Sequence, residues 1–150
     1  KMGNKAILEY VVPPLEGFWS VADPTFRGGG AAIADKSKFE WTMMIRQPDF
    51  VTEEIFQEAA TALKKKKPAL DVSKARLKRL AEGLCVQVMH IGPYDDEPAT
   101  ILALDTFAAE HGYIVDMSGD RRHHEIYLSD PRKTAPEKLK TVIRHPIKKA

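Results

Sequence analysis

The chain has 150 residues, of which 43% are hydrophobic and 29% are charged. This balance excludes a disordered chain and predicts an ordinary globular protein with one sizeable core or two small ones. Its 23 basic and 21 acidic residues leave a net charge of +2. That charge is too small to indicate a nucleic-acid or membrane surface, so we expect neither as a partner.

Cysteine usage and hydropathy indicate the compartment. Cys85 is the single cysteine of the chain, which excludes an internal disulfide and favours a reducing environment. No stretch approaches the roughly 20 apolar residues of a membrane span, and no signal-peptide pattern is present. We therefore expect a cytoplasmic protein. The chain begins KMGNK, without a clear initiator, and we expect a fragment whose true N-terminus is missing.

The first third of the chain predicts two strands separated by a glycine-rich loop. The β-branched run at residues 7–12 predicts a strand that ends at Pro13 and Pro14, because proline removes a ladder donor. Residues 15–23 then lead into a loop over residues 25–38. The RGGG motif in this loop lacks the Gly-Lys-Ser/Thr of a phosphate-binding loop, and we expect no cofactor. Residues 40–46 predict the next strand.

A helix is expected after Pro48. Thr52 has the residue type of an N-cap, Glu53 and Glu54 follow it, and lysines 64–67 suit the negative end of the helix dipole. The lysine run is interpreted as a helix end and linker. Residues 73–83 are ambiguous between helix and strand, and their alternation favours a strand.

The second half predicts strand, helix, strand, strand. Residues 84–90 form the clearest strand, and the acidic segment 95–98 with its proline is typical of a helix start. The helix is expected to end near Gly112 and to bury a stripe of apolar residues and one histidine: Ile101, Leu104, Phe107, Ala108 and His111. Strands are predicted at 123–129 and 140–145, the last ending at Pro146 after one short turn at 135–138.

Two strands end in nearly the same sequence, MMIRQP at 43–48 and TVIRHP at 141–146. This echo suggests an internal duplication, with a first pseudo-repeat at about 1–70 and a second at about 71–150 within one domain. The spacing of the second copy places the start of the first before residue 1. The first copy is therefore expected to lack its opening strand and most of its helix.

Glu125 is the most informative polar residue, because it places a carboxylate in the middle of a predicted strand, with two histidines before it and a tyrosine after it. A strand has a side-chain period of two, so Glu125, Tyr127 and His123 share one face while His124, Ile126 and Leu128 share the other. The carboxylate has four open interpretations: holding a cation, acting as a general base, helping to bind a metal, or facing water. A metal is disfavoured because His123 and His124 point to opposite faces, so we predict no metal site.

Five segments together resemble the GyrI-like small-molecule-binding family: VVPPLEGFW, WTMMIRQPDFVT, CVQVMHIGPYDDEP, HHEIYLSDPRK and APEKLKTVIRHPI. The resemblance implies an α+β fold of duplicated β-α-β-β units, with antiparallel sheets flanking a central cavity and helices on one side. The family includes effector-binding domains of multidrug-responsive transcription activators and a gyrase-inhibitor protein. A stand-alone branch includes hydrolases that open the cyclopropane ring of DNA-alkylating natural products with an aromatic cage.

The resemblance places the cavity glutamate of the family on Glu125, the candidate catalytic residue. We then expect the Ile126 face to pack on the helices and Glu125 to face the cavity. The candidate ligand-binding residues are aromatic, since aromatic faces attract flat or cationic ligands: Trp19, Tyr94, Tyr127, Trp41 and Tyr10. For each of these, ordinary packing or a place in a turn is the alternative.

Two functions are compatible with these residues. The chain binds hydrophobic or cationic xenobiotics and sequesters them, or it also hydrolyses electrophilic ligands with Glu125 activating water. The alternative is a non-catalytic, ligand-sensing effector domain of a transcription regulator. The absence of a helix-turn-helix pattern from these 150 residues counts against that reading.

Overall fold

The computed structural model describes residues 10–21 and 36–150, and the chain divides into two units. The first unit lies within residues 1–46 and 82–150, and the second is Gln47–Ala81. The start of the strand predicted at 7–12, and the glycine-rich loop as far as residue 35, lie outside the described residues. No helix in the described ranges is long and apolar enough to cross a membrane.

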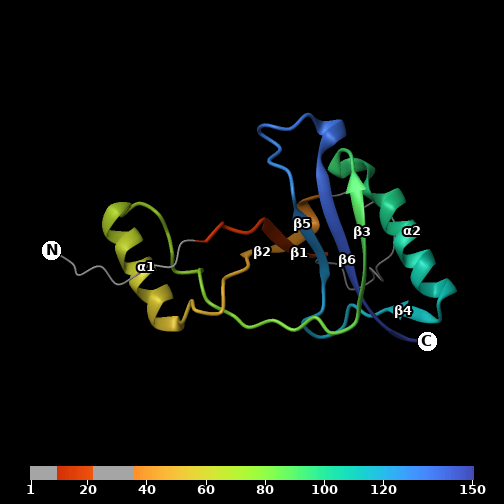
Figure 1. Cartoon of the computed structure of the whole chain (residues 1–150), viewed down its shortest axis with the longest axis horizontal. Coiled ribbons are helices and arrows are strands. Elements are labelled where there is room, and N and C mark those ends of the chain that lie inside the picture. Colours follow the sequence, from red (N-terminus) through yellow and green to blue (C-terminus); the bar gives the residue numbers. More distant parts are fainter. Residues whose placement is uncertain (1–9, 22–35) are drawn as a thin grey trace. The chain divides into compact units, whose positions relative to one another are not determined.

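The first unit is an α+β unit built on one antiparallel sheet, which confirms the predicted fold class (Figure 1). The sheet has the order β2-β1-β5-β6-β3, with β4 pairing to the far end of β6. It is continuous because β1 pairs with β5, whereas two sheets were expected. The strands are β1 (Leu15–Val21), β2 (Phe39–Ile45), β3 (Cys85–Ile91), β4 (Tyr113–Val115), β5 (His123–Tyr127) and β6 (Lys140–Lys149).

Helix α2 (Glu97–Glu110) packs against β3 and β4, and it follows a short 3-10 turn, η2 (Tyr94–Asp96). Pro98 lies in its first turn, where the missing N–H costs no intrahelical bond, and Gly112 follows the helix with φ of 78°. Leu104 and Ala108 are buried as predicted. Phe107 and His111 are exposed because the buried face is narrower than the predicted stripe.

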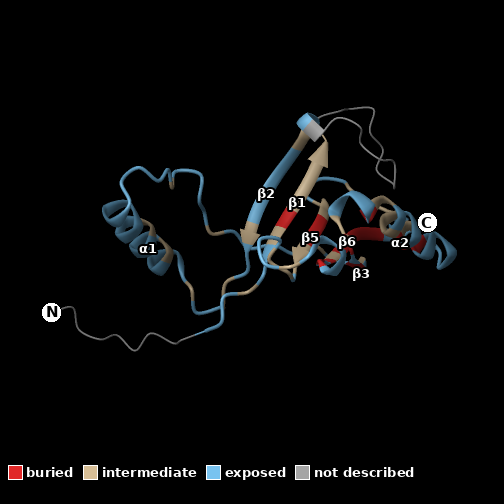
Figure 2. Ribbon diagram, turned by 90° about the horizontal axis from the view of Figure 1, so that it is seen from above, coloured by how far each residue is buried: buried red, intermediate tan, exposed pale blue. Residues whose placement is uncertain are grey.

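The core lies between α2 and one face of β6. Alternate residues of β6 point to this face, and Thr141, Ile143 and His145 are each no more than 1% exposed. Figure 2 shows the buried residues gathered in β1, β5, β6 and α2, whereas β2 is exposed along most of its length. Several members of this core are polar, so their hydrogen bonds matter as much as their apolar contacts.

Several strand limits differ from the prediction. Residues 10–12 are not in a strand; instead the two prolines precede β1, a position that proline tolerates. Strand β6 continues through Pro146 to Lys149. The Ile147 N–H donates to the Leu84 carbonyl at 3.0 Å, just before β3. Because successive N–H groups of a strand point to opposite sides, the nitrogen of Pro146 points away from β3, and its missing N–H removes no hydrogen bond to that strand. Strand β4 was not predicted, because three residues are too short for a periodic pattern.

The second unit contains helix α1 (Glu53–Lys66), which confirms the predicted helix. The Thr52 hydroxyl accepts a hydrogen bond from the Ile55 N–H at 3.4 Å, as an N-cap should. The strand predicted at 73–83 is wrong. These residues have no ladder partner in the described chain, and alternation alone does not make a strand without a neighbour to bond.

The two hairpins β1–β2 and β5–β6 are arranged symmetrically in the sheet order. β1 and β5 pair at the centre, and β2 and β6 lie outside them. This order is compatible with the duplication proposed from the IRQP and IRHP echoes. The duplication and the pseudo-repeat boundaries stay predictions.

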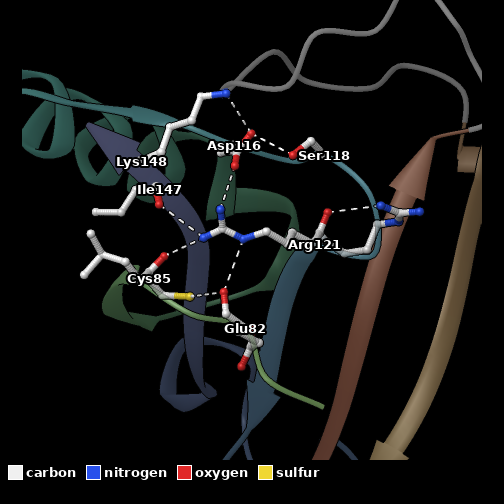
Figure 3. Close-up of polar contacts among 9 residues, drawn as sticks. Glu82, Cys85, Asp116, Ser118, Arg121, Ile147 and Lys148 are labelled. Atoms are coloured by element: carbon white, nitrogen blue, oxygen red, sulfur yellow. Dashed lines mark hydrogen bonds and ion pairs between the residues drawn. The ribbon is translucent and has the colours of Figure 1, made fainter. Parts of the chain in front are cut away.

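Arg121, in the loop before β5, ties together the ends of several strands (Figure 3). Its guanidinium donates to the carbonyls of Glu82 at 3.2 Å, Leu84 at 2.7 Å and Ile147 at 3.1 Å. It also forms an ion pair of 2.6 Å with Asp116. Each acceptor would lose a charge-assisted hydrogen bond if the guanidinium were removed.

We expect Arg121→Ala to lower the free energy of unfolding by about 2–3 kcal/mol, because three carbonyls and one carboxylate each lose a charge-assisted hydrogen bond. Urea denaturation followed by circular dichroism measures this loss. Arg132→Ala is the matched control: Arg132 pairs with Asp130 but its side chain is 85% exposed, so removing it should change the free energy of unfolding far less. Equal losses in both variants would contradict the role given to Arg121.

Candidate functional site

The strand register places Glu125 on the face of the sheet that α2 covers. Glu125 pairs with Ile143 on β6 and with Gly17 on β1, so all three residues share that face. The expectation that the Ile126 face packs on the helices is therefore wrong for α2. The physical reason is that His145, on the same face of β6 as Ile143, is held by Asp105 of α2, and the register fixes Glu125 on that side.

A pocket of about 1980 Å³ opens on this face, and all of its lining residues belong to the first unit. Strands β1 and β2 contribute apolar and aromatic side chains, while α2 and β5 contribute two carboxyl groups. The residues that matter most for its chemistry are Trp19, Trp41, Met43, Tyr94, Glu97, His123, Glu125 and Tyr127. The pocket thus combines aromatic walls with an acidic centre.

Four of the five predicted aromatic residues line this pocket: Trp19, Trp41, Tyr94 and Tyr127. The ring centroids of Trp19 and Trp41 are 5.8 Å apart, and those of Tyr94 and Tyr127 are 5.9 Å apart in an edge-to-face arrangement. Trp41 is 60% exposed, so it does not serve the core. Tyr10 is not among the lining residues, although Val11 and Val12 are, and residues 10–12 do not form the strand that was predicted to carry it.

Glu125 is 8% exposed and is held by hydrogen bonds on both oxygens. The Tyr127 hydroxyl donates to Oε2 at 2.6 Å, and His123 Nε2 lies 2.9 Å from Oε1. The Trp19 indole N–H in turn donates to the Tyr127 hydroxyl at 2.8 Å. The i−2 and i+2 neighbours of Glu125 therefore fix its carboxylate, as the period of the strand allows.

These contacts decide the charge of Glu125. Burial by itself would raise the pKa of the Glu125 carboxyl, but the hydrogen bond and charge of His123, with the hydrogen bonds of Tyr127 and Glu97, bring the pKa below its ordinary value. Burial and the nearby Glu125 carboxylate raise the pKa of the Tyr127 hydroxyl far above its usual range. Glu125 is thus ionised and Tyr127 is a firm donor.

Glu97, the first residue of α2, is a site residue that sequence reasoning missed. It is 6% exposed, and burial and the Glu125 carboxylate raise its pKa to about 8. Its side chain interacts with Glu125 and Thr141, while its Oε1 has no hydrogen-bond partner among the described residues. In the sequence, Glu97 is indistinguishable from an acid that favours a helix N-terminus, so no signal separated the two roles.

His123 begins a second missed feature, a chain of side chains that runs from Glu125 to α2. His123 Nδ1 lies 2.6 Å from His145 Nε2, and His145 Nδ1 lies 2.5 Å from Asp105 Oδ1. His145 is 1% exposed. Asp105 and His145 are 40 residues apart, which is why a sequence pattern does not connect them.

His124 points to the opposite face of the sheet, as the strand period predicted. Its Nε2 lies 2.9 Å from Glu16 Oε2 and its Nδ1 lies 2.9 Å from Glu82 Oε1. The two adjacent histidines therefore serve separate clusters. Within residues 10–21 and 36–150, no group of three or more His, Cys, Asp and Glu side chains is arranged to hold a metal ion.

The arrangement supports acid–base chemistry beside an aromatic surface. Two carboxyl groups face one pocket, and their environments separate their pKa values so that one is ionised and the other protonated at neutral pH. Such a pair can accept a proton at one carboxyl group and donate a proton from the other. The aromatic walls can hold a flat or cationic molecule above it.

Known proteins share this fold closely. A crystal structure of an uncharacterized conserved protein from Listeria innocua is 44% identical with a TM-score of 0.88, over 98% of this chain and 71% of that one. A crystal structure described as a hydrolase from Listeria innocua is 41% identical with a TM-score of 0.83, over 99% of this chain and 68% of that one.

A further Listeria innocua structure, also described as a hydrolase, is 43% identical with a TM-score of 0.81, over 98% of this chain and 70% of that one. None of the curated proteins matches the chain significantly. The GyrI-like small molecule binding domain matches residues 41–148. The chain belongs to the GyrI-like small-molecule-binding family, and the expectation drawn from its sequence motifs is confirmed.

Proposed function

We propose that the domain binds flat, hydrophobic or cationic xenobiotics in the aromatic pocket and hydrolyses those that carry a strained electrophilic ring, such as the cyclopropane of a DNA alkylator. The observation that carries this proposal is the pair of buried carboxyl groups, Glu125 ionised and Glu97 protonated, facing one aromatic pocket. Two similar Listeria innocua structures that are described as hydrolases support an enzymatic function.

Binding draws on the walls and the charge of the pocket. The Trp19 and Trp41 rings line it and offer π faces for a planar ligand. An aromatic face attracts a cation by about 0.5–2 kcal/mol, and the ionised Glu125 adds a full negative charge. A neutral ligand would rely on the aromatic and aliphatic walls alone, so cationic and polarised molecules are favoured.

Hydrolysis follows from the roles of the two carboxyl groups. Glu125 accepts a proton from water as the water oxygen forms a bond to the ring carbon. The strained carbon–carbon bond breaks, and its electron pair moves through the conjugated system to a carbonyl oxygen. That oxygen takes the proton of Glu97, and a proton passed from Glu125 to Glu97 restores both groups. Water is consumed and one ring-opened alcohol is formed.

Gly17 gives the aromatic residues the space that this reading requires. An alanine Cβ at this position would lie 2.9 Å from Trp19 Nε1, 3.2 Å from the Tyr127 hydroxyl and 3.3 Å from Met43 Cε. The first contact is shorter than real Cβ atoms show, so the indole or the phenol would have to move. Gly17 therefore allows the hydrogen bond from Trp19 to Tyr127 to form over Glu125.

We expect Glu125→Gln to lower turnover of a cyclopropane-bearing alkylator by about a hundredfold or more, with a much smaller change in binding, because the amide keeps the shape but cannot take the proton. Mass spectrometry of the ring-opened product measures turnover, and tryptophan fluorescence quenching measures binding. Glu110→Gln, at the exposed end of α2, is the control and should leave both unchanged.

If the wild-type protein binds the alkylator but forms no product above the buffer control, hydrolysis is excluded. The function is then sequestration or ligand sensing. Glu125 would then be a ligand-binding acid. A wild type that neither binds nor converts the alkylator would contradict the proposed ligand class.

Gly17→Ala should weaken binding of the same alkylator about tenfold, because the added methyl displaces Trp19 or Tyr127 from the wall of the pocket. Gly112→Ala is a contrasting variant: it strains a residue with φ of 78°, but its Cβ meets no atom within 4 Å. Both variants should lower the melting temperature, yet only the first should lower affinity. Equal affinities would show that the walls near Gly17 do not contact the ligand.

A further inference from the structure

The chain of side chains from Glu125 through His123 and His145 to Asp105 extends beyond the groups that take part in the chemistry described above. It crosses three elements, since Glu125 and His123 lie on β5, His145 on β6 and Asp105 on α2. The three links measure 2.9, 2.6 and 2.5 Å. The two imidazoles are enclosed, with side chains that are 14% and 1% exposed.

With both end carboxyl groups ionised, counting protons along these links gives the charge of the two rings. An ionised carboxylate only accepts hydrogen bonds, so the nitrogens that face Glu125 and Asp105 must each carry a proton. The link between the rings needs one more proton, on either His123 Nδ1 or His145 Nε2. Two neutral imidazoles carry two protons in total. Three protons on the pair therefore mean one positive charge shared by two rings.

The shared charge can move without any change in geometry. When the proton of the central link is on His123, that ring is the imidazolium and faces Glu125. When this proton crosses to His145, the imidazolium is the ring that faces Asp105. A positive charge is most stable beside the group that is ionised, so its position follows the charges at the two ends.

We propose that His123 and His145 hold one shared positive charge between Glu125 and Asp105, and that this charge moves toward Asp105 when Glu125 takes up a proton. The proposal rests on the role of Glu125 as a base. One proton crosses from His123 Nδ1 to His145 Nε2 as Glu125 is neutralised, and it returns when Glu125 is ionised again. Asp105 and His145 are thus positioning residues that act through His123.

The surroundings contain other groups that bear on this charge. Tyr127 donates to Glu125, and Glu97 on α2 is held next to Glu125 by Thr141. On the side of the pocket near His123, Asp116 is already engaged by Arg121 and Lys148. Besides Glu125 and His123, the titratable and charged residues that line the same pocket, within the part of the chain that the structure describes, are Glu40, Tyr94, Asp95, Glu97, Asp116, Arg122, Tyr127, Asp130 and Arg132.

A purely structural reading would treat the chain as a tie between α2 and the sheet. The molecule offers a matched control for that reading, because His124 is also buried between two carboxylates, Glu16 and Glu82, on the opposite face. His124 is 2% exposed and His145 is 1% exposed. Glutamine in place of either histidine should cost similar stability, but only His145 is linked to Glu125.

Nitrogen-15 NMR of the histidine rings, without ligand at neutral pH, tests the shared charge directly. The wild type should show three protonated nitrogens across His123 and His145. In Asp105→Asn the central proton should lie on His123, and in Glu125→Gln it should lie on His145, because only one carboxylate remains to attract the charge. Two protonated nitrogens in the wild type, or a central proton on the same ring in both variants, would overturn the proposal.

The pH dependence of alkylator turnover tests the link to Glu125. His145→Gln removes the positive charge that favours the ionised form of Glu125, so the acid limb should move to higher pH by about one unit. His124→Gln should leave the limb in place. An unmoved limb in His145→Gln would overturn the positioning role. If the wild type shows no turnover, the proposed function fails, and the nitrogen count still decides whether the charge is shared.

Discussion

A carboxylate buried on the central part of a sheet is the constraint on which the rest of the site depends. Removing an ion of this kind from water costs several kcal/mol unless other groups replace the water. Glu125 meets this cost with donors on both sides, Tyr127 on one oxygen and His123 on the other. Because the strand period places these donors at i+2 and i−2, a single strand supplies the acid and both partners.

The other features of the site follow from stabilising this group. Gly17 leaves room for the hydrogen bond from Trp19 to Tyr127. His145, itself held by Asp105, contacts His123 at Nδ1, the ring nitrogen that faces away from Glu125. Glu97 is the exception, because burial and the nearby Glu125 carboxylate both raise the free energy of its ionised form. The protein accommodates Glu97 in its protonated form. A buried polar cluster of this kind lowers the stability of the fold and shifts the pKa values of its members, a combination that is common at functional sites.

Strong local patterns predicted much of the fold. The caps and charges around Thr52 and Lys66, the acidic start of α2, and the β-branched run of β3 each carry their own signal, and each is confirmed. The predictions are wrong where a local sequence pattern is not matched by a neighbouring strand to pair with. Residues 73–83 alternate but have no ladder partner, and β1 begins after two prolines that were interpreted as a strand end. Strand period placed Tyr127 beside Glu125, but it could not place α2 on that face.

The site was predicted in part for the same reason. The side-chain period of β5 and the family motifs predicted Glu125 and the aromatic residues near it. Glu97, Asp105 and His145 reach the site from α2 and β6, through long-range register that no local pattern encodes. Glu97 also satisfies the ordinary preference for acids in a first helical turn, so its second role was concealed.

The site depends on a protonated Glu97 and an ionised Glu125 in the same pocket at neutral pH. Carbon-13 NMR of the glutamate side-chain carboxyl groups, titrated across the stable pH range, measures both states directly. Glu97 Cδ should titrate near pH 8, as its raised pKa of about 8 requires, and the Glu125 Cδ signal should stay that of a carboxylate well below pH 7. Two carboxyl groups that both titrate in the ordinary range for glutamate, between about pH 4 and 5, would contradict this assignment.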